Sequence, residues 1–374
     1  MRRPSRFRRR AGRACAAALA ALLCLGCTAQ GATAPETTAE EDSEPAEPTG
    51  PIGPDRQPRG HVTLAFVGDM HFQIQLAGLL AHPRGALGPI AHTLGAADVT
   101  MANLESAVTV RGTLEAKELE SPGERYWFRA SPAAFDVLDQ AGVDLVTMAN
   151  NHGADYGVTG LADTLRAMRT SRVAVIGIGR DRRSAVAPYR VDVRGTRIAF
   201  LAADASPREG SSSVWSAGPS HPGIVRARED PRALLAAVRA AGRTADVVVV
   251  YLHWGTENRR CPDPTQRGLA ASLARAGADV VVGSHAHVLQ GAGFRGDTYV
   301  AYGLGNFLWY HNRVRSTGVL RVDIEDGEVV GDRFAPAEIS TFGRPSLVRG
   351  PQRAAALRAW DRLRACTGLT DAGS

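Results

Sequence analysis

The stretch 281–291, VVGSHAHVLQG, is a run of valines that stops at Gly283 and then places His285 and His287 two residues apart. In an extended chain, residues i and i+2 point to the same side, so both imidazoles are expected to converge just beyond the end of a buried strand. A His-x-His pair alone is a weak signal, because ten histidines in 374 residues produce one by chance about one time in four. The meaning of the pair therefore depends on the rest of the chain.

The pattern at 281–291 recurs along the chain, where apolar β-branched runs alternate with helical patterns from residue 60 onward. Strands are expected within 61–69, 97–105, 143–153, 172–179, 189–204, 245–255 and 278–287, followed by further strands and hairpins. Helices are expected over 131–142, 158–170, 231–241 and 264–276, with a C-terminal helix over 351–366. This order predicts an α/β domain of mostly buried parallel strands with antiparallel additions.

Polar side chains follow these apolar runs at the point where each strand is expected to end. They are Asp69, His71, Asn103, Glu105, Asn150, Asn151, His152, His253, His285 and His287. Ligands of open α/β sheets gather outside the carboxyl ends of the strands. Imidazole, carboxylate and amide donors without sulfur suit Mn, Zn or Fe, with Ca or Mg as alternatives. Seven of these residues are candidate ligands, a number that suits two divalent ions sharing a bridging carboxylate.

The net charge of +6 is concentrated at the N-terminus. Residues 1–13 hold seven Arg and no acid, and an apolar run over 14–27 follows. This predicts a secretory signal over 1–26, too short for a comfortable membrane span. Without it, 37 basic residues stand against 38 acidic ones, a net charge of about −1, so the remaining chain has no footprint for nucleic acid.

Two endings of the signal fit the residues. Cleavage at an Ala-x-Ala-like site would release a secreted protein, whereas LCLGC (23–27) resembles a bacterial lipobox with Cys27 as the lipidated residue, although Cys24 departs from the usual pattern. Residues 27–59 are rich in Pro, Thr, Glu and Gly and predict a disordered acidic tether before a domain over 60–374. The tether favours an exported lipoprotein on the outer face of the cytoplasmic membrane.

Cys261 and Cys366 are the cysteines of the predicted domain. An oxidising compartment permits a bridge between them, but the sequence does not show that their Cα atoms come close enough. So few cysteines exclude a thiolate metal site.

Six sequence blocks occur in the order FVGD, ANLES, MANNHGADYG, YLHWGTE, VVGSHAHVLQG and YGLGNFLW, within residues 64–309. Together they resemble the CapA family of bacterial capsule or poly-γ-glutamate synthesis proteins, which is similar to the calcineurin-like metallophosphatases. The resemblance implies a four-layer α/β/β/α sandwich with a dinuclear metal site.

The resemblance also implies roles for individual residues. Asp69 and His287 would bind the first ion, Glu105 would bridge both ions, and Asn151, His253 and His285 would bind the second. His71 is a further candidate ligand, and His152 would be the general acid. Glu105 stands where metallophosphatases place a bridging Asp, which puts phosphoester chemistry in doubt.

Four further residues are candidates for substrate binding: Asn150, Trp254, Glu257 and Asn306. Each has a plainer interpretation. Asn150 and Asn306 could serve only as turn or capping residues, Trp254 could belong to the core, and Glu257 could be an ordinary surface residue. Asp155, close to Gly157, is expected to be a turn residue. A general acid at His152 needs an orienting carboxylate, and Asp155 is the nearest candidate in the chain.

Two classes of function follow. The first is a metal-dependent hydrolase of an amide or phosphoester in an anionic capsule polymer such as poly-γ-glutamate, or a metal-assisted acid–base enzyme on a peptide. The second is a non-catalytic accessory that binds the polymer during export, in contact with membrane subunits of the polymer synthase. In either case the membrane would be reached through the signal or lipid anchor.

Overall fold

Two β-sheets bring the polar strand ends together in the computed structural model, which describes residues 60–117, 123, 125–207, 215–310 and 313–373. The predicted signal segment, Cys27 and the tether fall outside the described residues. No helix of the described part of the chain combines the length and the apolar character that a membrane span requires.

The first sheet has the order β18-β17-β16-β1-β2-β5-β6, with β15 beside β1. Strands β1, β2, β5, β6 and β15 run parallel, and β16, β17 and β18 are added antiparallel. The strands are β1 Val62–Met70, β2 Val99–Leu104, β5 Leu145–Thr147, β6 Ala174–Ile176, β15 Asn306–Leu308, β16 Ser316–Glu325, β17 Glu328–Ile339 and β18 Pro345–Leu347.

The second sheet has the order β13-β14-β12-β11-β9-β8. Its central strands β14, β12, β11 and β9 are parallel, and an antiparallel strand closes each edge. The strands are β8 Tyr189–Val193, β9 Thr196–Ala205, β11 Val247–Trp254, β12 Val280–His285, β13 Leu289–Arg295 and β14 Thr298–Leu304.

Strand β11, in the middle of the second sheet, is buried on both faces. Successive side chains of a strand point to opposite faces. Val247, Val249 and Tyr251 join the core between the two sheets, whereas Val248, Val250 and Leu252 join the core beneath the helices. A continuous run of apolar residues is what such a doubly covered strand requires.

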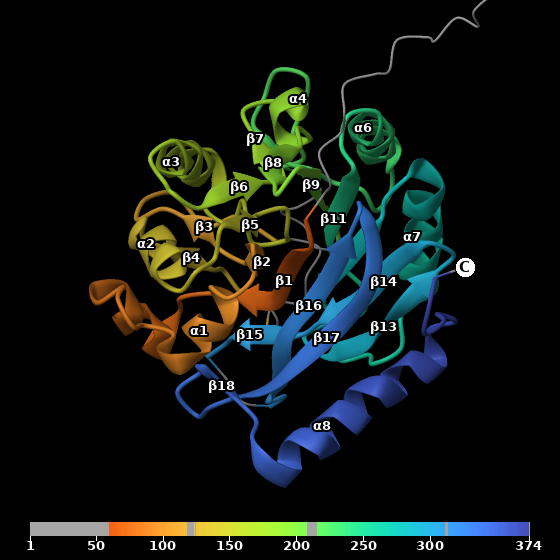
Figure 1. Cartoon of the computed structure of the whole chain (residues 1–374). Helices are drawn as coiled ribbons and strands as arrows, with labels where there is room; N and C mark the ends of the chain where they lie inside the picture. The colour runs from red at the N-terminus through yellow and green to blue at the C-terminus, as the bar shows by residue number, and fades with distance from the viewer. Residues whose placement is uncertain (1–59, 118–122, 124, 208–214, 311–312, 374) are drawn as a thin grey trace, which may run out of the picture. The chain divides into compact units, whose positions relative to one another are not determined.

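Helices cover the outer faces of the sheets (Figure 1). Residues of α2 (Ala133–Gln140) and α3 (Gly157–Met168) pack on the first sheet, and residues of α6 (Arg232–Gly242) and α7 (Pro264–Ala276) pack on the second. The predicted four-layer α/β/β/α arrangement is thereby confirmed. The expected helices over 264–276 and 231–241 are found with the same or nearly the same bounds.

Shorter elements complete the described chain: η1 Ile74–Ala81, η2 Gly88–Ile90, α1 Ala91–Leu94, β3 Ala107–Val108, β4 Arg129–Ala130, β7 Ile178–Gly179, α4 Arg182–Ala185 and β10 Gly223–Ile224. The C-terminal helix α8 spans Gly350–Leu363 and continues as η4, Arg364–Cys366. Trp360 of α8 stacks on Phe334 at 4.1 Å between ring centroids, so α8 closes part of the core between the sheets.

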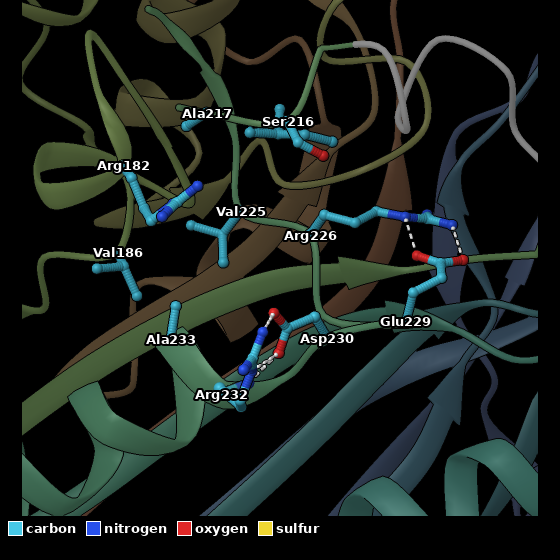
Figure 2. Close-up of a pocket in the computed structure, with 11 residues that line it drawn as sticks. Arg182, Val186, Ser216, Ala217, Val225, Arg226, Glu229, Asp230, Arg232 and Ala233 are labelled. Carbon is cyan, nitrogen blue, oxygen red and sulfur yellow. Dashed lines mark hydrogen bonds and ion pairs between the residues drawn. The ribbon is translucent and has the colours of Figure 1, made fainter. Parts of the chain in front are cut away.

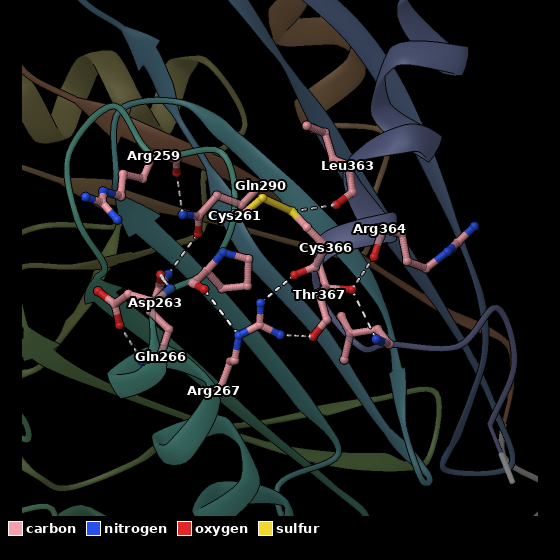
Figure 3. Close-up of a disulfide and its surroundings, with 12 residues drawn as sticks. Arg259, Cys261, Asp263, Gln266, Arg267, Gln290, Leu363, Arg364, Cys366 and Thr367 are labelled. Atoms are coloured by element: carbon pink, nitrogen blue, oxygen red, sulfur yellow. Dashed lines mark hydrogen bonds between the residues drawn. A yellow bond between two sulfur atoms is a disulfide. The ribbon is translucent and has the colours of Figure 1, made fainter.

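A disulfide joins Cys261 to Cys366 across 105 residues, with their Cα atoms 5.7 Å apart. Figure 3 shows the guanidinium of Arg267 beside this bond. Arg267 donates to the backbone carbonyls of Pro262, Cys366 and Thr367 at 3.2, 2.5 and 2.6 Å. The loop between β11 and α7 is therefore tied to the end of the C-terminal helix by one covalent bond, and two hydrogen bonds from Arg267 of α7 reinforce the connection.

Candidate metal centre

A bulge in β1 aims Asp69 at the gap between the sheets. The register of β1 shifts between Phe66 and Asp69, and the backbone N–H of Asp69 donates to the carbonyl of Gly305 at 2.9 Å. A Cβ on Gly68 would lie 1.8 Å from that same carbonyl oxygen. The glycine of the FVGD block is therefore required by the close approach of the two backbones.

Both oxygens of the buried Asp69 carboxylate are engaged. Oδ1 accepts from Asn103 Nδ2 at 2.8 Å, and Oδ2 accepts from the backbone N–H of His285 at 3.1 Å. Oδ2 also lies 3.3 Å from His287 Nδ1. Asp69 thus links the first sheet to the histidine segment of the second sheet.

Three fully buried residues form the inner group: Asp69, Glu105 and His253. One donor atom from each lies within 4.8 Å of those of the other two. His253 Nε2 is 3.6 Å from Glu105 Oε1 and 2.8 Å from Asn151 Oδ1. The structure therefore brings the predicted ligand Asn151 to the edge of this group.

A second set of three residues forms the outer group: Glu257, His285 and His287. Their donor atoms also lie within 4.8 Å of one another. The two imidazoles lie close together as expected. The backbone that carries them is not extended as expected, because φ is +80° at His285 and +57° at His287. The chain leaves the extended conformation at the end of β12, and two left-handed residues aim the rings.

The protonation of the buried histidines suits metal binding. Burial lowers the pKa of His253 and of His285 well below the usual range, and only a neutral imidazole can bind a metal ion. At His287 burial also favours the neutral form, but hydrogen bonding to Asp69 and the charges of Asp69 and Glu257 outweigh it and raise the pKa. Binding of a cation at His287 would therefore release a proton.

His152 lies beside the centre with its own carboxylate. Its Nε2 is 3.7 Å from Glu105 Oε1, and its Nδ1 is 2.6 Å from Asp155 Oδ2. The ammonium of the buried Lys117 is 3.0 Å from Asp155 Oδ1 and 3.2 Å from His152 Nδ1. Burial lowers the pKa of His152 to about 4, even though Asp155 favours the charged form.

His71 is buried near the centre but has aromatic neighbours. Its ring centroid is 4.7 Å from that of Phe128 and 4.4 Å from that of Trp309. Its Nδ1 accepts from the backbone N–H of Gln73 at 3.0 Å, and its Nε2 is 3.4 Å from the backbone N of Tyr310. His71 joins neither donor group among the described residues, so its role as a ligand stays a prediction.

Two of the predicted substrate-binding residues contact other site residues instead. Asn150 Nδ2 donates to Asn103 Oδ1 at 2.9 Å, and Asn150 Oδ1 accepts from the backbone N–H of His152 at 3.0 Å. Asn306 Oδ1 lies 2.8 Å from His287 Nδ1. Both amides therefore orient neighbours of the centre, and their contact with substrate stays a prediction.

Trp254 occupies the core, which corrects its interpretation as a substrate-binding residue. The indole is 1% exposed, stacks on Tyr302 and donates to the Tyr302 carbonyl at 2.7 Å. A Cβ on Gly283 would lie 2.0 Å from the indole nitrogen, which explains the glycine within the valine run. The neighbouring residue His253 takes the site side of β11, so Trp254 must take the other side.

Two supporting residues, Asn103 and Lys117, make contacts in the site that the sequence did not reveal. Asn103 follows its strand in the expected way, but only the structure shows it 2.8 Å from Asp69 and 3.1 Å from His253 Nδ1. Asp155, the nearest candidate in the chain for the carboxylate that orients His152, does lie 2.6 Å from His152 Nδ1. Lys117 is 35 residues from His152 and carries no motif that would have signalled the contact.

A pocket of about 680 Å³ lies next to the end of β9 (Figure 2). Arg226, one of its lining residues, pairs with the buried Asp204, whose register partner on β11 is His253. Figure 2 also shows Arg226 against Glu229 and Arg232 against Asp230. Two of the three guanidinium groups in its lining already face carboxylates, and we assign the pocket no ligand.

Comparison with known proteins gives relatives in capsule synthesis. The chain is 31% identical over 271 residues to the "PGA biosynthesis protein CapA" of Bacillus subtilis, covering 68% of this chain and 67% of that protein. It is 29% identical to the "Capsule biosynthesis protein CapA" of Bacillus anthracis, covering 62% and 59%. A "Probable polyglutamine synthesis accessory protein" of Mycobacterium tuberculosis is 25% identical, covering 66% and 67%. The chain thus spans about three fifths to two thirds of these relatives.

Solved structures with a similar fold include phosphatases of low sequence identity. A novel phosphatase of Mycoplasma pneumoniae matches with a TM-score of 0.46 and 12% identity, covering 79% of this chain and 97% of that one. A 5'-nucleotidase of Candida albicans matches with a TM-score of 0.41 and 11% identity, covering 82% and 58%. At 11–12% sequence identity, these similarities concern the fold alone and not the function.

The family match covers most of the described domain. Residues 63–311 match the family described as "Bacterial capsule synthesis protein PGA_cap". This range includes all six sequence blocks and every member of the inner and outer groups. The resemblance seen in the sequence is confirmed, and the chain belongs to the bacterial capsule synthesis protein family.

Proposed function

We propose that this protein is a metal-dependent hydrolase that cleaves an anionic capsule polymer of the poly-γ-glutamate type. One observation carries the proposal: two groups of nitrogen and oxygen donors lie side by side at the strand ends, with His152 3.7 Å from Glu105 of the inner group. Divalent ions held there would polarise the scissile carbonyl and supply hydroxide near neutral pH. The names of the relatives support the polymer, and the donor sets support the metal.

Individual residues would position the donor atoms and donate a proton to the leaving group. Asp69 and Asn103 hold the inner donors in place, since the Asn103 amide touches both Asp69 and His253. His152 would give its Nε2 proton to the leaving amine, with Asp155 fixing the ring through Nδ1. Bound cations and Lys117 disfavour the imidazolium form of His152, whereas Asp155 and a bound polyanion favour it.

Lys117 adds a constraint on this arrangement. Its ammonium can only donate, so it competes with Asp155 for His152 Nδ1 and divides the charge of the Asp155 carboxylate. The three groups form a buried network in which each member limits the orientation of the other two. We expect this network to hold the ring with its Nε2 toward the centre.

The test is cleavage of poly-γ-glutamate by the purified exported chain loaded with Mn²⁺, Zn²⁺ or Fe²⁺. The release of amino groups and the decrease in polymer chain length are measured. His152→Ala should keep its metal content and lose roughly 10²–10⁴-fold in rate. The matched control is His92→Ala, since His92 is exposed and belongs to neither donor group. A bis-aryl phosphodiester assayed in parallel separates amide from phosphoester chemistry.

The accessory function has a specific observation in its favour, the name of the Mycobacterium relative. It predicts metal-dependent binding of the polymer without cleavage under any of these ions. In that case His152→Ala would support polymer export as well as the unchanged protein does. No turnover combined with tight, chelator-sensitive polymer binding would therefore replace the hydrolase proposal with the accessory one.

Export and lipidation form the second part of the proposal. The Arg-rich start, the apolar run and Cys27 support a lipoprotein, and the Cys261–Cys366 bond supports an oxidising compartment. Metabolic labelling with a fatty acid should mark the protein and should fail to mark Cys27→Ala. Equal labelling of both forms, or none of either, would exclude the lipid anchor at Cys27.

A further inference from the structure

Glu257 places a carboxylate beside two imidazoles at the mouth of the centre. Its Oε1 is 3.9 Å from His287 Nε2, and its side chain is 52% exposed. We infer that Glu257 is a metal ligand, and that Glu257, His285 and His287 form a separate, solvent-facing cation position. The inference depends on metal binding by the centre and not on the proposed hydrolysis. It differs from the ligand set implied by the family resemblance, which does not include Glu257.

Each imidazole of the outer group has one ring nitrogen positioned to bind a cation. His287 Nδ1 contacts Asn306 Oδ1 at 2.8 Å and Asp69 Oδ2 at 3.3 Å, which leaves Nε2 on the side of Glu257. A hydrogen bond from the second ring nitrogen is the usual support of a metal-bound histidine. His285 is fully buried, and its Nε2 has no hydrogen-bond partner in the described structure. A buried ring nitrogen without a partner points to a ligand.

The loop that carries Glu257 is fixed although the side chain is exposed. The backbone N–H of Asn258 donates at 2.8 Å to the carbonyl of Ala286, the residue between the two histidines. Thr256 Oγ1 donates to Asp263 at 3.0 Å, and Gln290 Nε2 donates to the Arg259 carbonyl at 2.7 Å. The bond between Cys261 and Cys366 closes the loop. Binding an ion therefore requires ordering of the Glu257 side chain but not of its backbone.

The donor set indicates which ion the outer position takes. Two imidazole nitrogens and one carboxylate are the ligands of catalytic zinc and of non-haem iron sites, and they leave coordination positions open. The inner group offers two carboxylates and one imidazole, which is a harder set that suits Mn²⁺ or Mg²⁺. We therefore expect the outer position to bind Zn²⁺ or Fe²⁺ more tightly than Mn²⁺ or Mg²⁺, and to be the one that solvent and substrate reach.

The experiment is titration of the chelator-stripped, disulfide-bonded chain with Zn²⁺ alone, measured by calorimetry and by elemental analysis after gel filtration. The unchanged protein should bind two ions. Glu257→Gln, which keeps the size of the side chain, should weaken one of them by on the order of 10–100-fold and leave the other unchanged. Glu257→Asp, with a shorter carboxylate, should give an intermediate effect and serves if Glu257→Gln does not fold.

The matched control is Glu338→Gln, because Glu338 is 54% exposed and pairs with Arg315 away from the centre. It should bind Zn²⁺ as the unchanged protein does. Two ions of unchanged affinity in Glu257→Gln would overturn the ligand assignment, and loss of both ions would overturn the separation into two positions. Loss of one ion from a protein that cleaves no polymer would support this inference and count only against the hydrolase proposal.

Discussion

The inner and outer groups use the same kinds of donor atom, but different parts of the fold hold them. Asp69 and His253 stand at strand ends and Glu105 directly follows β2, all fully buried. In the outer group, His285 ends β12, while His287 lies in the turn after it and Glu257 in a loop tied by a disulfide. Sheet formation alone places the inner donors, whereas the outer donors also depend on bonds made outside the sheets.

The largest effect is expected where the two groups meet, at Asp69. Its Oδ1 is 3.7 Å from His253 Nδ1, and its Oδ2 holds the His285 backbone and lies 3.3 Å from His287. Asp69→Asn removes the charge from both groups and should lower the content of both ions to near zero, as elemental analysis would show. Asp361→Asn, on the exposed side of α8, should keep both. If Asp69→Asn lost only one ion, Asp69 would belong to a single group.

The disulfide should affect one group only. Replacing Cys261 and Cys366 together by Ser should cost roughly 2–5 kcal/mol in the free energy of unfolding, measured in urea. Zn²⁺ titration of the same variant should show weaker binding at the outer position and unchanged binding at the inner one. Equal weakening of both would mean that the loop supports the whole centre, and no weakening would mean that hydrogen bonds suffice to place Glu257.

A substitution at Trp254 tests whether the core face of β11 can be changed without affecting the site face. Trp254→Phe removes the donor to the Tyr302 carbonyl and leaves space beside Gly283, so the free energy of unfolding should fall by about 1–3 kcal/mol. Neither metal position should change, because His253 lies on the opposite face of β11. A Trp254→Phe protein of normal stability with altered metal content would show that the indole acts on the site.

A substitution at Asp279 compares the two ends of β12. Asp279 directly precedes this strand, whereas His285 is its last residue. Burial raises the pKa of Asp279 to about 6. Because the folded pKa exceeds the unfolded one, Asp279 favours folding below about pH 4, and this contribution is lost as the pH rises through about 6. Asp279→Asn should therefore gain stability relative to the unchanged protein between about pH 4 and pH 8, by on the order of 1 kcal/mol.

The measurement is urea unfolding of both proteins in chelator, so that the metal-binding groups titrate identically in the two. Asparagine can still accept the Val248 N–H that Asp279 accepts at 2.7 Å. A difference in stability that stays constant across this pH range would show that Asp279 does not titrate as described. Zn²⁺ binding by Asp279→Asn should be normal at both positions.

Much of the fold follows from local patterns in the sequence. Helix α7 spans the expected residues 264–276, and Asp263 and Gln266 form a capping box at its start. The strands follow the valine-rich runs, and most donors appear at their ends because the chain reverses direction there. The alternation of side chains along an extended strand would also have placed Trp254 opposite His253, so that signal was present in the sequence.

Other parts of the site depend on contacts between distant segments. Lys117 meets Asp155 and His152 only after the first sheet has formed, and no local pattern marks a buried lysine in a loop. The left-handed backbone at His285 is accompanied by a hydrogen bond from its N–H to the Asp69 carboxylate, which lies 216 residues away in the sequence. Such features come from tertiary packing, which sequence periodicity does not report.

The 105-residue span of the Cys261–Cys366 bond imposes an order on maturation. The Glu257 loop is made well before the C-terminal helix, yet it can be fastened only when that helix arrives. We therefore expect a newly exported chain to assemble its inner donors first and to complete the outer position last. Binding of both ions would then require formation of the disulfide. A chain truncated before residue 366 could fold its sheets but would not complete the outer position.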